Sequence, residues 1–295
     1  MLLEQRIKEI KHLSASEKMI SDYILNIKDQ IQYLSTRDIA KATYTSSATV
    51  VRFAQKLGYL GFNELKQDYL TELNYIHRHF QNVDANYPFN SHDSMNNIIG
   101  KMQQLFNETI DDTLSLIQLK DIENVISLLD KCDTIAIFGL GNASLFGERF
   151  QHQMLRINKK VVIETKVGEY GFSTHTLTHH DCAIVISYSG ETETVINYAK
   201  LLKQKHIPII ALTSMGGNTL SQYAQYVLPI STREKQYSKI SSFSSDYSIL
   251  YLLDLLYCGY FALNYDHHLK SKIALSKLIE KCHTSHNEII HEDDI

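Results

Sequence analysis

The chain has 295 residues, of which 44% are hydrophobic and 21% charged, and its formal net charge is −4. This length accommodates two domains, and the composition is that of a globular protein rather than a disordered chain. No stretch reaches the roughly 18 apolar residues of a membrane span, and the first residues lack the apolar block of a signal peptide. We therefore expect a cytoplasmic protein with no membrane partner.

The charge is unevenly distributed along the chain. Residues 1–80 contain 11 Lys and Arg against 9 Asp and Glu, a balance of +2, whereas the remainder contains 18 against 24, a balance of −6. A basic segment favours a polyanion such as nucleic acid. The balance of +2 is weak support, but it assigns any such partner to the N-terminal end.

Cysteine and histidine are present without the spacings of a metal site. The four cysteines, which form no CxxC pair, are Cys132, Cys182, Cys258 and Cys282. Three of them lie in apolar surroundings, and we expect those three to be reduced thiols in or near the core. The adjacent pairs His179–His180 and His267–His268 point in different directions on a helix, and we expect them to be solvated. Neither a metal nor another cofactor is predicted.

Residues 1–80 have helical periodicity throughout. Ser14 and Glu17 form a capping box ahead of apolar residues spaced i, i+3, i+4. Further helices are predicted over 36–42, from about 47 to 57 and from 63 to about 80. In the second of these, Val50, Phe53, Ala54 and Leu57 form an apolar stripe, and Gly58 follows where a left-handed stop is expected.

Two short helices, a tight connection and a third helix with a polar outer face are typical of a helix-turn-helix DNA reader. Short donors near the N-terminus of the third helix suit base edges, and the later cations suit phosphates. This outer face comprises Ser46, Ser47, Thr49, Arg52, Gln55 and Lys56. A small helical bundle with an ordinary solvated face has the same periodicity, so this pattern alone leaves both interpretations open.

Residues 81–94 contain Asp, Asn, Ser and Pro without a period, which predicts an interdomain linker. Residues 95–130 return to helical spacing, and Asp121 is the predicted cap of a helix that runs to Leu129. These connecting helices could pack on the next domain or on a second subunit. A polar tail is expected over 281–295.

Strand-type and helical runs alternate over residues 131–280. Strands are predicted at 134–139, 161–164, 182–187, 209–212 and 226–230, with helices near 144–156 and 194–203 and a closing helix from 244 to 261. Near-continuous apolar strands separated by helices indicate a buried parallel sheet in a doubly wound α/β domain.

Two turns of this domain suit an anion. Gly139-Leu140-Gly141, with Glu164 after the second strand, fits a dinucleotide site, but Ser144 replaces the third glycine of that fingerprint. A second, hydroxyl-rich turn spans Ser187–Thr192, and two such turns favour one phosphate held from two strand ends. Ser189 or Thr192 serving only as a helix cap is the alternative.

The N-terminal motifs LSTRDIA (34–40) and TSSATVVRFAQKLGYLGFNELK (45–66) resemble the helix-turn-helix domain of MurR/RpiR-type transcriptional regulators. The resemblance implies that Arg37 joins the six outer-face residues as a DNA contact. One departure is Tyr44, where the family often has a small residue or glycine. Since tyrosine tolerates a positive φ poorly, a slightly different turn geometry is expected.

The C-terminal motifs GLGNAS (139–144), SYSGET (187–192) and PIIALT (208–213) resemble the sugar isomerase (SIS) domain, a flavodoxin-like fold, as do residues 233–234, 241–245 and 253–257. The resemblance implies that a sugar phosphate binds to Gly141, Asn142, Ser144, Ser187, Ser189, Gly190 and Thr192, with Glu234 and Ser242 near the sugar. The family often has Ser-Arg at the start of the last helix, where this chain has Ser245-Asp246.

Two functions are compatible with these domains. An isomerase needs a general base near the sugar, for which Glu234 is the best candidate, followed by His175 or His179. An attached DNA reader is not needed by an isomerase and favours a regulator without enzymatic activity. The expected partners are a double-stranded DNA operator and a sugar-phosphate effector, with the chain working as a homodimer or a dimer of dimers. An SIS-domain phosphosugar isomerase is the alternative.

Overall fold

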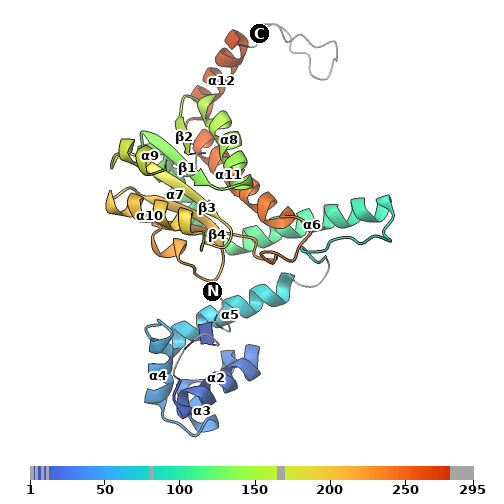
Figure 1. The fold of residues 1–295 in the computed structure, drawn as a ribbon, viewed down its shortest axis with the longest axis vertical. Helices are drawn as coiled ribbons and strands as arrows, with labels where there is room; N and C mark the ends of the chain where they lie inside the picture. Colours follow the sequence, from blue (N-terminus) through green and yellow to red (C-terminus); the bar gives the residue numbers. More distant parts are fainter. Residues whose placement is uncertain are drawn as a thin grey trace. The chain divides into compact units, whose positions relative to one another are not determined.

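The computed structural model describes residues 13–79, 83–164 and 170–279, together with Leu3, Arg6, Ile7 and Ile10 (Figure 1). These residues divide into two compact units. The first comprises the described residues within Met1–Asp112, Ser214–Asn218 and Ser231–Ser244, and the second those within Thr113–Thr213, Thr219–Ile230 and Ser245–Ile295. The predicted polar tail at 281–295 lies outside the described residues.

The N-terminal part of the first unit is helical, as predicted. Its elements are α2 (Ala15–Ile27), the 3-10 helix η1 (Lys28–Tyr33), α3 (Thr36–Ala42), α4 (Ser47–Lys56) and α5 (Phe62–His79). One core of buried side chains joins them, and the predicted stripe of α4 contributes Val50, Phe53, Ala54 and Leu57 to it. The periodicity therefore identified the inward face correctly.

Local hydrogen bonds begin and end these helices where the sequence indicated. Ser14 and Glu17 form the predicted capping box of α2, and Ser35 with Asp38 forms another at α3. Gly58 has a φ of 91° after α4, which confirms the left-handed stop. Tyr44 has a φ of 51° in the turn after α3, so this turn keeps a left-handed residue although tyrosine disfavours it.

Other segments of the first unit contact helix α6 (Met95–Leu116). Val83 and Ala85 form a small apolar core with Leu105 of α6. Arg233 is almost completely buried, and its Nη2 donates to the Val83 carbonyl and to Glu108 of α6, each at 2.7 Å. The residues that follow Asn82 are thus folded against other parts of this unit.

The second unit contains the expected α/β domain. Its strands are β1 (Thr134–Gly139), β2 (Lys160–Glu164), β3 (Cys182–Ser187), β4 (Ile209–Ser214) and β5 (Tyr226–Ile230). They form one sheet in the order β2-β1-β3-β4-β5, with β1 parallel to β2 and β3, and β3 parallel to β4. This order is flavodoxin-like, and its topological switch point lies between β1 and β3.

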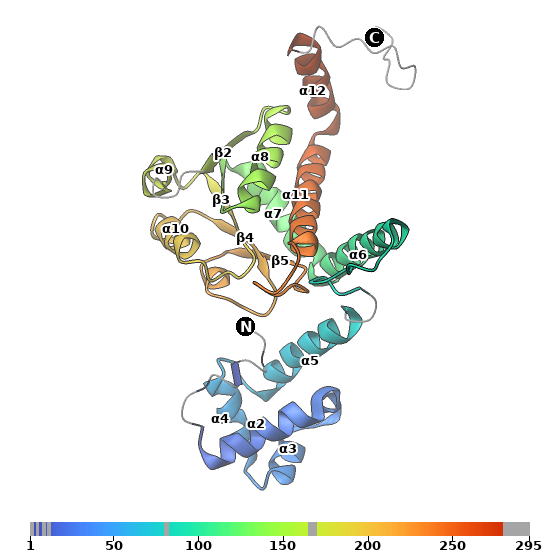
Figure 2. The ribbon, with the colours of Figure 1, turned by 45° about the vertical axis from the view of Figure 1, so that its right-hand side comes forward.

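Helices cover both faces of the sheet, as Figure 2 shows. One face packs against α7 (Leu119–Lys131), α8 (Asn142–Leu155) and α11 (Phe243–Leu263), and the other against α10 (Glu193–Gln204) and the 3-10 helix η2 (Leu220–Gln222). The short α9 (Tyr170–Thr176) and the long α12 (Tyr265–Ile279) were not predicted. The doubly wound fold class is nevertheless confirmed.

Three sequence-based expectations are wrong in detail. Gln118, not Asp121, occupies the N-cap of α7, because the helix begins at Leu119 and leaves Asp121 in its first turn. Cys258 is exposed, whereas Cys132 and Cys182 are buried with their sulfur atoms 3.3 Å apart. His268 is buried because its ring stacks on Tyr260 and its Nδ1 lies 3.0 Å from the Phe261 carbonyl oxygen.

Among the described residues, none of the helices combines the length and the apolar character that a membrane-spanning segment requires.

Candidate functional site

The outer face of α4 presents the polar side chains that the sequence assigned to DNA. Arg52, Gln55 and Lys56 are exposed, as is Arg37 on α3. Lys56 pairs with Glu17 of α2 at 2.9 Å, and the Ser14 backbone N–H together with this lysine lowers the pKa of Glu17. A surface ion pair of this kind is worth at most about 1 kcal/mol, so Lys56 can exchange Glu17 for a phosphate.

The N-terminus of α4 is organised by hydroxyl groups. Ser46 is the N-cap, and its Oγ accepts from the Thr49 backbone N–H at 3.2 Å. The hydroxyls of Ser46 and Thr49 lie 2.9 Å apart, and Arg52 reaches the Thr49 hydroxyl at 3.4 Å. Ser46 therefore has a structural role in addition to its predicted DNA contact, and these three side chains form one hydrogen-bonded set. Ser47 is partly buried beside them.

In the second unit, the two predicted phosphate turns lie next to one another. Gly139 at the end of β1 pairs with Ile186 near the end of β3, so the turns that follow these strands adjoin at the switch point. A Cβ atom on Gly139 would lie 2.7 Å from the Ala143 Cβ, which explains the glycine. Gly141 is the N-cap of α8 and has a φ of 62°, a conformation that favours glycine.

The turn after β3 is held by its own hydroxyls. The backbone N–H of Gly190 donates to the Ser187 Oγ at 3.3 Å, and that of Glu191 donates to the Ser189 Oγ at 3.2 Å. In both bonds the serine oxygen is the acceptor, so the O–H hydrogens can donate to an anion.

Thr192 occupies the N-cap of α10, yet its side chain makes no capping hydrogen bond within the described part of the chain. Its hydroxyl lies 3.5 Å from the Ser187 hydroxyl instead. The alternative that Thr192 is merely a helix cap therefore does not fit the geometry. For Ser189 the bond to the Glu191 N–H within the turn fits either interpretation.

The turn after β1 is more strongly committed to internal bonds. The Ser144 hydroxyl donates to the Gly141 carbonyl at 2.8 Å. Asn142 donates its side-chain amide to Asp246 of α11 at 2.8 Å. Asp246, which stands where the resembled family often has arginine, thus links the start of α11 to the first phosphate turn.

One residue that sequence reasoning missed supports the second turn. Glu191 accepts from the Thr219 backbone N–H at 2.8 Å and from the Thr219 hydroxyl at 2.7 Å. The bidentate contact ties the turn after β3 to the segment that enters η2. No local pattern could have revealed it, because the two residues are 28 positions apart.

Glu234 and Ser242 belong to the first unit, whereas the phosphate turns belong to the second, and their contact with the sugar stays a prediction. The Glu234 side chain is fully buried. It accepts from the Ser244 backbone N–H at the start of α11 and from Lys239 at 3.0 Å. Both carboxylate oxygens therefore have partners within the protein, which does not favour a general base. His175 and His179 are exposed.

Comparisons with known proteins agree with these two parts of the chain. A family model described as the helix-turn-helix domain of the rpiR family matches residues 1–74, and a SIS domain model matches residues 128–258. An uncharacterized HTH-type transcriptional regulator of Haemophilus influenzae is 29% identical over 245 residues, which are 83% of this chain and 84% of that protein.

Two solved structures share the fold. The Vibrio vulnificus NanR protein complexed with ManNAc-6P has a TM-score of 0.61 at 22% identity, with 96% of this chain and all of that chain covered. The sugar isomerase domain of an RpiR transcription factor from Sphaerobacter thermophilus has a TM-score of 0.53 at 18% identity, with 59% of this chain and 97% of that chain covered.

A helix-turn-helix reader joined to a flavodoxin-like SIS domain defines a transcriptional regulator rather than an enzyme. More particularly, the match to the rpiR-family helix-turn-helix domain precedes the match to the SIS domain along this chain.

Proposed function

We propose that this protein is a cytoplasmic regulator of carbohydrate metabolism that binds an operator through α3 and α4 and a sugar phosphate through the turns after β1 and β3. The effector, a sugar or amino-sugar phosphate, alters how the protein binds DNA. The observation that carries the proposal is the pairing of two polar turns at the switch point, where ligands of such sheets bind.

The chemistry of the second turn supports a phosphate. Ser187, Ser189 and Thr192 offer hydroxyl donors at the N-terminus of α10, where the helix dipole favours a negative charge. NanR, which shares the fold, was solved with an amino-sugar phosphate, and this supports the ligand class. In the proposed complex Gly141, Asn142 and Gly190 shape the phosphate site.

Regulation requires the ligand to favour one DNA-binding arrangement over another. Helix-turn-helix readers act on paired half-sites, so we propose that the chain binds its operator as a homodimer or a dimer of dimers. The residues proposed to contact DNA are Arg37, Ser46, Ser47, Thr49, Arg52, Gln55 and Lys56.

The proposal is tested by thermal unfolding with N-acetylmannosamine 6-phosphate, glucosamine 6-phosphate and their unphosphorylated sugars as probes. A ligand that binds only the folded protein raises the melting temperature. At a hundredfold excess over its Kd, such a ligand adds about 2.7 kcal/mol to the free energy of unfolding. We expect a shift with at least one phosphorylated sugar and none with its unphosphorylated form.

Ser189→Ala and Thr192→Val are expected to reduce the shift, because each removes a hydroxyl donor from the phosphate. Ser173→Ala, in α9 outside the two turns, is the matched control and should keep the full shift. A shift that survives in both Ser189→Ala and Thr192→Val would refute the assignment of the phosphate to this turn.

A further inference from the structure

Tyr44 has an unusual combination of backbone strain and exposure. It follows α3 at the position where helices commonly end in a left-handed glycine. Its N–H donates to the Lys41 carbonyl at 3.4 Å, and the next N–H, that of Thr45, donates to the Ala40 carbonyl at 2.8 Å. The side chain is 93% exposed, so packing does not explain the tyrosine.

The same pair of backbone bonds ends three other helices. The left-handed residues there are Gly58, Asn158 and His206. Glycine has no Cβ penalty in this conformation, and Asn and His adopt it more often than other residues. Tyrosine has neither advantage. Strained residues of this kind are concentrated at functional sites, and an observed outlier justifies a hypothesis of function.

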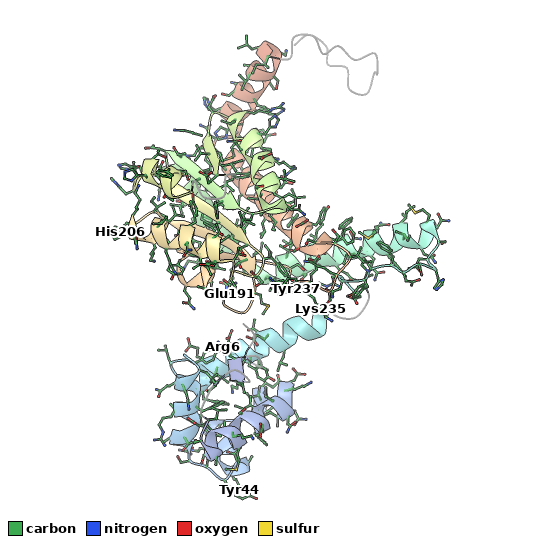
Figure 3. All side chains as sticks on the ribbon, in the orientation of Figure 1. Arg6, Tyr44, Glu191, His206, Lys235 and Tyr237 are labelled. Carbon is green, nitrogen blue, oxygen red and sulfur yellow. The ribbon has the colours of Figure 1, made fainter. Side chains whose placement is uncertain are left out.

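The surrounding turn holds Tyr44 firmly in place. The buried Thr43 hydroxyl donates to the Ile39 carbonyl at 2.7 Å and lies 2.9 Å from the Thr45 hydroxyl. Ser46, two residues after Tyr44, is the N-cap of α4. Figure 3 shows the Tyr44 side chain at the tip of this turn, pointing away from the helices of the N-terminal part.

We infer that Tyr44 is a further DNA-binding residue, whose phenol hydroxyl donates to a backbone phosphate next to the bases read by α4. The inference rests on the proposed DNA-binding function. In helix-turn-helix readers the N-terminus of the recognition helix meets the base edges. A turn residue two positions before that N-terminus would lie next to the adjacent DNA backbone. Tyrosine is one of the side chains that donate hydrogen bonds to backbone phosphates.

The test compares Tyr44→Gly and Tyr44→Phe with the unmodified protein, using a random-sequence DNA duplex because a phosphate contact is independent of sequence. Both variants lose the hydroxyl, and we expect affinity to fall about tenfold, as for one hydrogen bond to a charged group. Tyr44→Gly relieves the left-handed strain and should raise the melting temperature by about 4 °C. Tyr44→Phe should leave it unchanged.

Two matched variants separate the loss of this hydrogen bond from the relief of backbone strain and from the loss of a charge. His206→Gly relieves the same strain in the SIS domain and should raise stability without a change in DNA affinity. Arg52→Ala should lower affinity and also reduce the slope of log affinity against log salt by about 1, because it removes a charge. Loss of the neutral Tyr44 hydroxyl should leave that slope unchanged.

DNA affinity that is unchanged in Tyr44→Phe or in Tyr44→Gly would overturn the inference while the DNA-binding function stands. If the unmodified protein bound no duplex even at low salt, the proposed function would fail and the inference with it.

Discussion

At the scale of single residues, Glu72 in α5 makes the N-terminal part sensitive to pH. Its side chain is buried, and its Oε2 accepts from the Leu3 backbone N–H at 2.7 Å. Burial raises its pKa from the ordinary 4.5 to about 7, although the bond from Leu3 acts in the opposite direction. The folded protein therefore retains a proton that the unfolded chain releases near pH 4.5.

The sign of the pH dependence follows from this shift. Because the folded-state pKa is the higher one, the stabilisation is complete below about pH 4.5 and is lost as the pH rises to about 7. The shift corresponds to a free energy on the order of 3 kcal/mol. Glu72→Gln stays uncharged, so we expect it to be more stable than the unmodified protein at pH 8 and equal to it near pH 4.5.

Urea unfolding at the two pH values measures this difference. Glu64→Gln is the control, because Glu64 is exposed on the same helix and accepts from the Leu60 N–H at 2.6 Å. An equal effect of Glu72→Gln at both pH values would show that burial of the charge is not the cause.

At the scale of elements, two helix N-termini differ in what their cap residues do. The Ser35 hydroxyl accepts from the Asp38 N–H in the capping box of α3, whereas the Thr192 side chain does not cap α10 in the described structure. A capping side chain contributes about 1 kcal/mol. Ser35→Ala should therefore destabilise the first turn of α3 by about that amount, while Thr192→Val should leave the first turn of α10 nearly unchanged.

Native-state hydrogen exchange of the amides in each helix measures these effects separately. Faster exchange along α10 in Thr192→Val would mean that the hydroxyl stabilises the helix and would weaken its assignment to a ligand. The Ser35→Ala variant shows in the same experiment that a lost cap is detectable.

At the scale of the whole molecule, the segment after the DNA reader is hydrogen-bonded to the segment after β5. The Asn86 Oδ1 accepts from the Lys235 N–H at 2.6 Å, and the Asn86 carbonyl accepts from the Ile240 N–H at 2.9 Å. Glu234, one of the residues proposed to contact the sugar, immediately precedes Lys235 in the chain. We propose that a sugar contacted by Glu234 acts on the residues that follow α5 through these two hydrogen bonds.

We therefore expect Asn86→Ala to reduce the change in DNA affinity caused by the effector more than it reduces DNA affinity itself. By linkage, DNA must change the affinity for the effector by the same factor by which the effector changes the affinity for DNA. Calorimetric titration of the protein with the effector, with and without DNA, therefore measures the coupling a second time. Asn90→Ala, at an exposed position in the same segment, is the control. Unaltered coupling in Asn86→Ala would exclude this route.

Much of the local structure was predictable because its causes are local. The capping box of Ser14 and Glu17, the glycine after α4 and the apolar runs of β1 and β3 act over a few residues. The spacing of these residues along the sequence therefore predicted the bounds of the helices and strands nearly correctly. The hydroxyl-rich turn at 187–192 was visible for the same reason.

Contacts between distant residues decided the rest. The sequence by itself determined that there is a helix-turn-helix reader, a doubly wound sheet and two polar turns. Only the tertiary structure decided that β1 lies beside β3, which brings those turns together. The bonds from Glu191 to Thr219 and from Asn142 to Asp246, and the burial of Glu234 and His268, also depend on packing between segments far apart in the chain. The physical reason is that strand pairing and the burial of a charged side chain depend on which residues lie nearby in the folded protein. The residues adjacent in the sequence do not determine them.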